Sequence, residues 1–317
     1  MKIFNDIYNI IENSSSIGVV AHKNPDGDTV CSALALVLAL SKRGKIAELI
    51  CDDVIDPKLN IIPRIELFNL RALLSYDTVI VVDSSDISRI GESSKLLPRA
   101  KHTISIDHHK THEKFTEISY LQEASSNCEN VYNFISEHYN EYIDATIAEI
   151  LFAGIITDTG GFGNSSVNSD SHAIASQLLK FNFDSNKIYY HFIKANTYDT
   201  FMLKMRSLSK TMFFADRQIA VVVFSQEDFK NTNTNMQNTS GLLYDIINIE
   251  EVKIAVGISE VKDKNFKISL RTKGNADAAT IAQYFGGGGH TRAAGFVRNG
   301  YVENVIDEIL KVCADNL

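Results

Sequence analysis

The sequence has few cysteines and no paired cysteine motif. Its four cysteines, Cys31, Cys51, Cys128 and Cys313, form no CxxC pair. Scattered thiols of this kind are typical of a reducing compartment and argue against a disulfide framework or a cysteine-rich zinc site. We therefore expect free thiols in a cytoplasmic protein.

The sequence also lacks a long apolar run. The longest uncharged apolar stretch, Thr29 to Ser41, has 13 residues, whereas a transmembrane helix needs about 20. The N-terminal segment MKIFNDIYNIIENSSS has an acidic residue at position 6 and no small-residue cleavage site, so we expect no secretory signal. These features predict no membrane partner.

Basic charge is in deficit, with 31 Lys and Arg against 39 Asp and Glu and a net charge of −8. This balance excludes proteins that coat long duplex nucleic acid, because such proteins present basic surfaces. Residues 1–214 carry 20 basic and 26 acidic side chains, whereas residues 215–317 carry 11 and 13. Carboxylates therefore collect in the first two thirds of the chain.

The pattern of apolar runs predicts an α/β protein of two domains. Four short runs are typical of parallel strands buried on both faces: 17–21, 46–50, 78–82 and 103–106. Helical patterns separate them, the clearest being Thr29 to Arg43, which Gly44 follows as a C-terminal cap residue. This alternation predicts a doubly wound, mainly parallel sheet over residues 1–185.

The pattern changes after residue 185. We expect a helical connector over 186–214 and a smaller α/β domain over 215–317. The expected elements of this second domain are three strands, a helix and a polar surface loop: 219–224, 252–259, 266–271, 276–285 and 231–239.

Chemically active side chains follow the predicted strands. His22, Asp26 and Asp28 lie on a turn between a strand and a helix. Imidazole and carboxylates without thiolates favour Mn²⁺, Mg²⁺ or similar ions. The alternative is that Asp28 only caps the helix and His22 is a surface histidine.

Three further segments place acids and histidines at the ends of apolar runs. Asp83 ends the run VIVVD, and its alternative is a solvated turn residue. In SIDHH, Asp107 precedes His108 and His109, so one imidazole can bind a metal while the other faces a substrate. In ITDTGGF, Asp158 follows a helical run, and its alternative is a turn residue beside a glycine cap.

The order and content of these four segments resemble the signature motifs of the DHH phosphoesterases. That superfamily includes RecJ-like exonucleases, family II inorganic pyrophosphatases and nanoRNases. Residues Lys267 to Phe296 resemble the DHH-associated domain, with an Arg-bearing strand, a helix and GGGGH. The likeness covers nearly the whole chain and is strongest to the bacterial nanoRNase and pAp-phosphatase branch.

The resemblance implies two Mn²⁺ ions per chain, with Mg²⁺ or Co²⁺ as substitutes. The implied ligands are His22, Asp26 and Asp83 for one ion, and Asp28, Asp83, His108 and Asp158 for the other. The implied catalytic residues are His109, which would contact the scissile phosphate, Asp107, which would support it, and the bridging Asp83. Such an ion pair can activate a bridging water.

The glycine run before His290 is the second implied site. Backbone N–H groups in such a run can hold a phosphate, although a flexible linker is the alternative. The implied substrate-binding residues are Arg271, Gly287, Gly288, Gly289 and His290. One departure is Gly163, which stands where many relatives carry a basic residue.

The resemblance implies a hydrolase that degrades short oligoribonucleotides to mononucleotides and removes the 3′-phosphate from pAp. Two alternatives stay open: a phosphodiesterase for pApA or cyclic di-AMP, and a non-catalytic nucleotide- or RNA-binding protein. A homodimer is compatible with the sequence. The remaining histidines have no partner pattern and are expected to be structural or at the surface: His102, His112, His138, His172 and His191.

Overall fold

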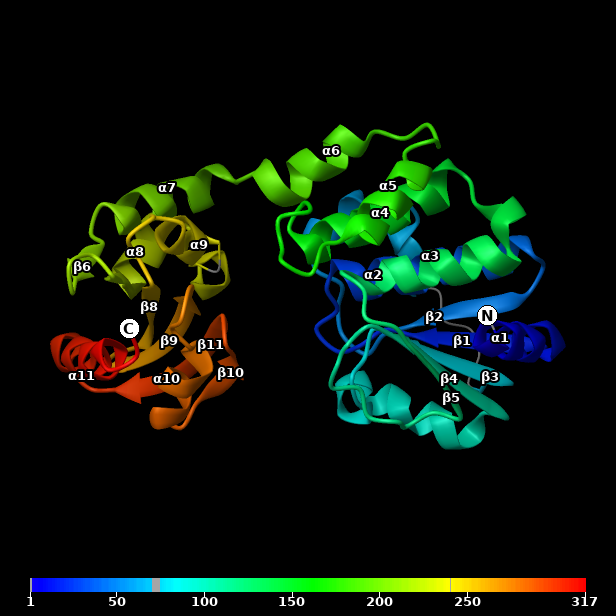
Figure 1. Cartoon of the computed structure of the whole chain (residues 1–317), viewed down its shortest axis with the longest axis horizontal. Helices are drawn as coiled ribbons and strands as arrows, with labels where there is room; N and C mark the ends of the chain where they lie inside the picture. The colour runs from blue at the N-terminus through cyan, green and yellow to red at the C-terminus, as the bar shows by residue number, and fades with distance from the viewer. Residues whose placement is uncertain (1, 70–74, 240) are drawn as a thin grey trace. The chain divides into compact units, whose positions relative to one another are not determined.

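A computed structural model describes residues 2–69, 75–239 and 241–317 (Figure 1). The chain divides into two compact units, Met1–Ala195 and Asn196–Leu317. The division falls within the predicted connector, 186–214. Among the described residues, no helix is long and apolar enough to cross a membrane.

The first unit is built on a five-stranded sheet with the order β2-β1-β3-β4-β5, and all neighbouring strands in it are parallel. The strands are β1 Ser16–Val20, β2 Ile46–Ile50, β3 Thr78–Val82, β4 His102–Asp107 and β5 Ile118–Leu121. Carboxyl ends of parallel strands meet at one edge of a sheet, so this topology places the residues after β1, β3 and β4 together.

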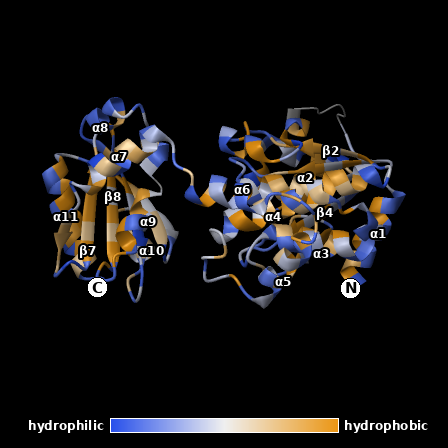
Figure 2. Ribbon diagram, turned by 90° about the horizontal axis from the view of Figure 1, so that it is seen from above, coloured by the Kyte–Doolittle hydropathy of each residue, from blue (hydrophilic) through white to orange (hydrophobic). Residues whose placement is uncertain are grey.

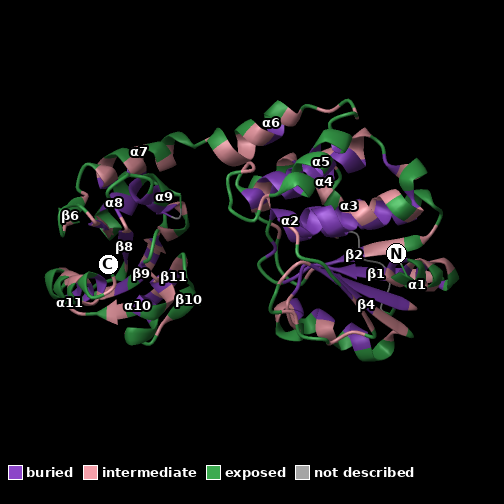
Figure 3. Cartoon of the chain, in the orientation of Figure 1, coloured by how far each residue is buried: buried purple, intermediate pink, exposed green. Residues whose placement is uncertain are grey.

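Alternate residues of the strands pack on opposite faces of this sheet. Ile80 and Val82 pack with the helical layer, whereas Val79 and Val81 pack with Ile90 and its neighbours. The helices are α1 Lys2–Asn13, α2 Gly27–Lys42, α3 Asn127–His138, α4 Ala145–Thr159, α5 Ser169–Leu178 and α6 Ser185–Tyr189. Figure 3 shows the buried strands and α2 in purple.

The second face is covered by 3₁₀ structure rather than by α-helix. The segment η3, Ile87–Arg99, connects β3 to β4 and supplies the apolar side chains of this face. The other short helical turns are η1 Pro57–Ile61, η2 Ile65–Asn69, η4 Asn140–Tyr142 and the π-helical turn η5 Tyr190–Lys194. Both faces are therefore covered, as a doubly wound α/β fold requires.

The start of α2 corrects one alternative that the sequence left open. Asp26, not Asp28, is the N-cap of this helix, and its Oδ1 accepts hydrogen bonds from the backbone N–H groups of Asp28 and Thr29. The helix therefore begins at Gly27, two residues before the predicted start. Asp28 is free to point away from the helix axis toward other elements.

The second unit carries a mixed six-stranded sheet with the order β10-β11-β9-β8-β7-β6. The strands are β6 Met212–Phe214, β7 Ile219–Phe224, β8 Ile254–Lys262, β9 Asn265–Thr272, β10 Gly288–His290 and β11 Ala293–Asn299. The helices are α7 Tyr198–Leu208, α8 Gln226–Asn231, α9 Leu242–Ile247, α10 Ala278–Tyr284 and α11 Val302–Ala314, with the turn η6 Met236–Thr239.

Each face of the second sheet has its own apolar cluster. One cluster joins the sheet to α10 and α11, and the other joins it to α7, α8 and α9. Figure 2 shows apolar residues concentrated along β7 and β8. The predicted fold class, a parallel α/β domain followed by a smaller α/β domain, is confirmed.

The glycine run is ordered rather than a flexible linker. Gly288, Gly289 and His290 form β10, which pairs antiparallel with β11. Several predicted boundaries shift: β8 runs from Ile254 to Lys262 instead of 252–259, β9 from Asn265 to Thr272 instead of 266–271, and α10 from Ala278 to Tyr284 instead of 276–285. The polar segment 231–239 holds the turn η6, whose Thr239 is buried, so it is not a simple surface loop.

Candidate metal centre

Acidic and imidazole side chains converge at the carboxyl edge of the first sheet. His22 follows β1, Asp83 follows β3, and His108 follows β4. The N-terminus of α2 and the C-terminal turn of α4 add three carboxylates to this edge: Asp26, Asp28 and Asp158. Three groups of ligand atoms, each within 4.8 Å of one another, form there: His22, Asp26 and Asp83; Asp28, His108 and Asp158; and Asp83, His108 and His109.

The first group surrounds the imidazole of His22. Its Nε2 lies 3.6 Å from Asp83 Oδ2 and 3.8 Å from Asp26 Oδ2. His22 and Asp83 are almost fully buried, whereas the Asp26 side chain is 59% exposed. The group therefore opens to solvent on the side of Asp26.

The second group surrounds the imidazole of His108. Its Nε2 lies 3.3 Å from Asp83 Oδ1, 3.9 Å from Asp28 Oδ2 and 3.9 Å from Asp158 Oδ2. Asp83 thus presents one carboxylate oxygen to each group. A carboxylate in this position can bridge two cations.

Backbone carbonyl groups orient both imidazoles. His22 Nδ1 lies 2.8 Å from the carbonyl oxygen of Lys23, and His108 Nδ1 lies 3.0 Å from that of Ala124. A proton on Nδ1 would be donated to each carbonyl, which leaves Nε2 to face the carboxylates. Metal-binding histidines are commonly held in this way.

Asp83 sits on an unusual backbone. Its φ angle is +55°, in the left-handed region that non-glycine residues rarely occupy. Its N–H still donates to the Ile106 carbonyl oxygen, so the sheet continues up to this residue. The turn directs the carboxylate across the sheet edge between His22 and His108. Strained residues of this kind are frequent at functional sites.

The imidazoles control the ionisation of Asp83. Burial alone would raise the pKa of its carboxyl group, but the adjacent imidazoles of His108 and His22, at 3.3 and 3.6 Å, lower this pKa to about 2. Burial would lower the pKa of His108, but Asp83 and Asp28 raise it to about 10. Without a cation, the imidazolium of His108 therefore offsets part of the negative charge.

Burial and neighbouring carboxylates act together on the other acids. They raise the pKa of Asp158 to about 6 and raise that of Asp28 above its usual range. The Asp28 carboxylate also accepts hydrogen bonds from the N–H groups of Asn127 and Cys128, at 2.5 and 3.0 Å, in the first turn of α3. This helix end helps to hold a carboxylate that is otherwise costly to bury.

The separations fit a cation better than direct hydrogen bonds. Ligand atoms that share an ion at about 2.1 Å lie roughly 3–4 Å apart, which matches the 3.3–3.9 Å found here. His22 Nε2 and Asp83 Oδ1 are buried and have no hydrogen-bond partner in the described part of the chain. Oxygen and imidazole donors without thiolate are suited to Mn²⁺ or Mg²⁺.

Asp107 lies behind the ligands and joins two histidines. Its Oδ1 is 2.7 Å from His109 Nδ1, and its Oδ2 is 2.7 Å from His112 Nδ1. The side chain of His112 is 1% exposed. His112 is therefore structural, one of the two expected outcomes, but it has a carboxylate partner that sequence spacing did not show, because the turn after β4 folds back onto Asp107.

The loop after Asp158 closes α4 without a basic residue. Gly160 is the left-handed C-cap, and Asn164 donates a side-chain hydrogen bond to the carbonyl oxygen of Asp158 at 2.7 Å. A Cβ atom on Gly161 would lie 2.7 Å from the Tyr189 ring. Gly160 and Gly161 therefore allow this loop to pack closely. After the ITDTGGF segment, where a basic residue is missing, Asn164 instead bonds to the backbone of Asp158.

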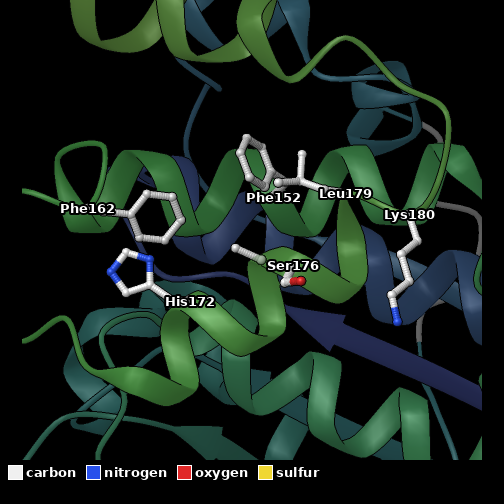
Figure 4. A pocket seen from close by; sticks show the side chains of 7 residues that line it. Phe152, Phe162, His172, Ser176, Leu179 and Lys180 are labelled. Atoms are coloured by element: carbon white, nitrogen blue, oxygen red, sulfur yellow. The ribbon is translucent and has the colours of Figure 1, made fainter.

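A separate cavity of about 390 Å³ lies beside α4 and α5 (Figure 4). Its walls are mainly aromatic and aliphatic, with one lysine: Phe152, Phe162, His172, Ala175, Ser176, Leu179 and Lys180. None of these residues carries a carboxylate. The cavity is therefore distinct from the candidate metal centre, although Phe162 belongs to the ITDTGGF segment.

Three of the five predicted substrate-binding residues, Arg271, Gly288 and His290, share one face of the second sheet, whereas Gly289 pairs with Ala294 in the alternate row. Arg271, Ala293 and His290 are directly paired across β9, β11 and β10, so their side chains point the same way. The guanidinium of Arg271 lies 5.2 Å from the ring centre of Tyr244, which is 54% exposed. Arg271 Nε is buried without a hydrogen-bond partner in the described residues.

The adjacent row of this face has almost no side chains. Ser269, Gly295 and Gly288 are paired across the same three strands. A Cβ atom on Gly287 would clash with the carbonyl oxygen of Gly295, whereas one on Gly288 would meet nothing within 4 Å. A ligand can therefore come close to the backbone at Gly288, next to Arg271 and His290.

Comparison with known proteins identifies the same two regions. A sequence profile of the DHH family, N-terminal domain, matches residues 16–155, and a DHHA1 domain profile matches residues 216–317. The probable bifunctional oligoribonuclease and PAP phosphatase NrnA of Streptococcus mutans is 26% identical over 311 residues, which cover 96% of each chain. The bifunctional oligoribonuclease and PAP phosphatase NrnA of Thermus thermophilus is 24% identical and covers 100% of this chain and 94% of its own.

A solved structure agrees over almost the whole chain. The crystal structure of an exopolyphosphatase-related protein from Bacteroides fragilis superposes with a TM-score of 0.89 and 26% identity, covering 99% of this chain and 96% of that one. The two profiles occur in the same order as the two compact units. This chain therefore belongs to the DHH phosphoesterase family, with a DHH N-terminal domain followed by a DHHA1 domain.

Proposed function

We propose that this chain hydrolyses short oligoribonucleotides to mononucleotides and also removes the 3′-phosphate from pAp. The observation that carries this proposal is the pair of ligand groups that share Asp83. The activities named for the two NrnA relatives support the substrate class. Family membership supports the coarser statement, a phosphoesterase that acts on nucleic acid.

We assign two Mn²⁺ ions to this centre, with Mg²⁺ or Co²⁺ as substitutes. The proposed ligands are His22, Asp26 and Asp83 for one ion and Asp28, Asp83, His108 and Asp158 for the other. Two such ions, when bound, would activate a water and stabilise the oxygens of an in-line displacement.

His109 is the proposed group for contact with the scissile phosphate. Its Nδ1 is held by Asp107 at 2.7 Å, and its side chain is 33% exposed. With Nδ1–H donated to Asp107, Nε2 faces the phosphate, and the doubly protonated imidazole would donate its Nε2–H to an oxygen of the phosphate or of the leaving group. No nucleophilic side chain is required, because the attacking group is water.

The second unit is proposed to bind the far end of the substrate. Arg271 offers a fork of N–H groups suited to phosphate, and the open backbone at Gly288 lies on the same sheet face as His290. Residues 215–317 carry 11 basic and 13 acidic side chains. This charge balance favours a short ligand over a long strand.

The test is a product time course with Mn²⁺-loaded protein on RNA of two to ten nucleotides, pAp, pApA and cyclic di-AMP. We expect mononucleotides from the shortest RNA and a kcat/KM at least about 10³-fold lower for Asp83→Asn, because several kcal/mol of charge stabilisation would be lost. Asp86→Asn is the matched control, since Asp86 caps η3 and belongs to no ligand group.

Three results would contradict the proposal. Wild-type protein that releases no mononucleotide would contradict the activity, and equal rates for wild type and Asp83→Asn would contradict the site. A marked preference for cyclic di-AMP over linear dinucleotides would contradict the substrate class, because a site built around a free terminal phosphate should reject a ring.

A further inference from the structure

Asp107 connects the partly exposed imidazole of His109 to the buried imidazole of His112. Its Oδ1 accepts from the N–H of His108 at 2.9 Å and from His109 Nδ1 at 2.7 Å. In the described part of the chain, Oδ2 has a single hydrogen-bond partner, His112 Nδ1, at 2.7 Å. The two oxygens thus have different tasks: Oδ1 faces the centre, and Oδ2 is anchored from behind.

His112 is itself held firmly. Its ring stacks on Phe115 with centroids 5.3 Å apart and an interplanar angle of 29°. Its Nε2 lies 3.4 Å from Ser105 Oγ, and its backbone N–H donates to the His109 carbonyl oxygen. The turn 109–112 therefore returns the imidazole to Asp107 and fixes its rotamer.

Burial makes this contact consequential. The side chains of Asp107 and His112 are 0% and 1% exposed, whereas that of His109 is 33% exposed. A buried carboxylate oxygen that loses its donor is not resolvated, so its orientation is costly to keep. Asp107 would then rotate toward other donors, and His109 would lose its fixed partner.

We propose that His112 is a positioning residue that holds Asp107 so that Asp107 orients His109 toward the scissile phosphate. The inference rests on the proposed function, because it assumes that His109 contacts the phosphate. It adds a residue that binds neither the cations nor the substrate. His112 acts only through the hydrogen bonds to Asp107 and from Asp107 to His109.

Two substitutions separate this role from packing. In His112→Asn the amide nitrogen can take the place of Nδ1, whereas in His112→Gln it takes the place of Nε2. We expect His112→Gln to lower kcat by about 10–100-fold, as loss of a supporting hydrogen bond commonly does. We expect KM to stay within about threefold and His112→Asn to keep kcat within about threefold of wild type.

His109→Ala provides a second comparison. If His112 acts through His109, then His112→Gln in the His109→Ala background causes no further loss of kcat. His102→Gln is the matched control, because His102 also pairs with a carboxylate, Glu117, but both side chains are exposed. Melting temperature and bound Mn²⁺ are measured for every variant.

A spectroscopic measurement makes the result independent of turnover. In Mg²⁺-loaded protein, ¹⁵N shifts report which nitrogen of His109 carries the proton. We expect protonated Nδ1 in wild type and His112→Asn, and a mixture of tautomers in His112→Gln.

The proposal is overturned if His112→Gln keeps the wild-type shifts, if His112→Asn and His112→Gln lower kcat equally, or if the loss of kcat persists without His109. Inactive wild-type protein would instead overturn the proposed function, and the shifts would still test His112.

Discussion

Asp83 occupies a left-handed backbone position and divides its two carboxylate oxygens between two imidazoles. A strained non-glycine residue costs about 1–3 kcal/mol. The local cost is offset by the position that it gives the side chain, since an extended backbone would continue the strand past the sheet edge. Stability and function are therefore in conflict at this residue.

The ionisation of His108 predicts how cation binding depends on pH. Burial lowers the pKa of His108, but Asp83 and Asp28 have the larger effect and raise it to about 10. The metal-free protein therefore holds a proton on His108 at pH 7. A cation requires the neutral imidazole. Binding should therefore release about one proton, and affinity should rise as pH increases from 7 toward 10.

Asp158 adds a second step at lower pH. Its pKa is raised to about 6 by burial and neighbouring charges, so the group is protonated below that value and cation affinity should fall more steeply there. Calorimetry of Mn²⁺ binding in buffers with different ionisation enthalpies measures the protons released. A Mn²⁺-binding enthalpy that is the same in every buffer, together with an affinity that does not change between pH 5 and 8, would contradict this account.

Sequence reasoning reached the ligand types but not every contact. His22, Asp83 and His108 could be grouped because each follows an apolar run, and parallel strand ends meet in space. The partnership of His112 with Asp107 could not be foreseen, because it depends on the path of a four-residue turn. An imidazole five residues after an acid was the only available signal.

At the scale of elements, Gly288 in β10 and Gly287 just before it predict opposite outcomes for the same substitution. Gly287→Ala places a Cβ atom against the carbonyl oxygen of Gly295, so it should destabilise the second unit by about 1–3 kcal/mol. Gly288→Ala meets nothing within 4 Å and should leave the melting temperature unchanged. Thermal unfolding of the two variants checks this difference.

The same pair tests the role of the open backbone. If a phosphate approaches at Gly288, the methyl group introduced by Gly288→Ala should raise KM for a dinucleotide by about tenfold. KM for bis(p-nitrophenyl) phosphate, which has no second phosphate or base, should not change. A Gly288→Ala protein with normal KM for both substrates would show that the run serves only the packing of the strands.

In the first sheet, strand boundaries were predicted to within one residue wherever a buried apolar run marked the strand. Ile46–Ile50 and Thr78–Val82 were predicted without error. The four-residue strand β5 at Ile118–Leu121 was not foreseen, because only one of its residues is buried. The covering of one sheet face by η3 was also hidden, since Gly91 and Pro98 interrupt its sequence.

At the scale of the whole molecule, the two units have separate apolar cores, and the ligand groups found among the described residues all belong to the first. A fragment of residues 1–195 should therefore fold, bind the cations and hydrolyse bis(p-nitrophenyl) phosphate. It should have a KM for dinucleotides raised by about tenfold or more, because Arg271 and His290 are lost.

Steady-state kinetics and metal analysis of this fragment beside the full chain provide the measurement. The full chain with Arg271→Ala is the matched control, as it keeps both units. Loss of cation binding in the fragment would contradict the assignment of the centre to the first unit. An unchanged KM for dinucleotides would contradict a substrate role for the second.

The spread of the ligands along the chain has a consequence for synthesis. His22 and Asp158 are 158 − 22 = 136 residues apart, which corresponds to roughly 7–27 s of translation at about 5–20 residues per second. Throughout that interval a nascent chain lacks Asp158, the α4 residue that completes the proposed centre. If the proposed ions bind here, their capture would be a late event in the biogenesis of this unit, and we expect truncated chains that end before Asp158 to bind them more weakly than a complete centre does.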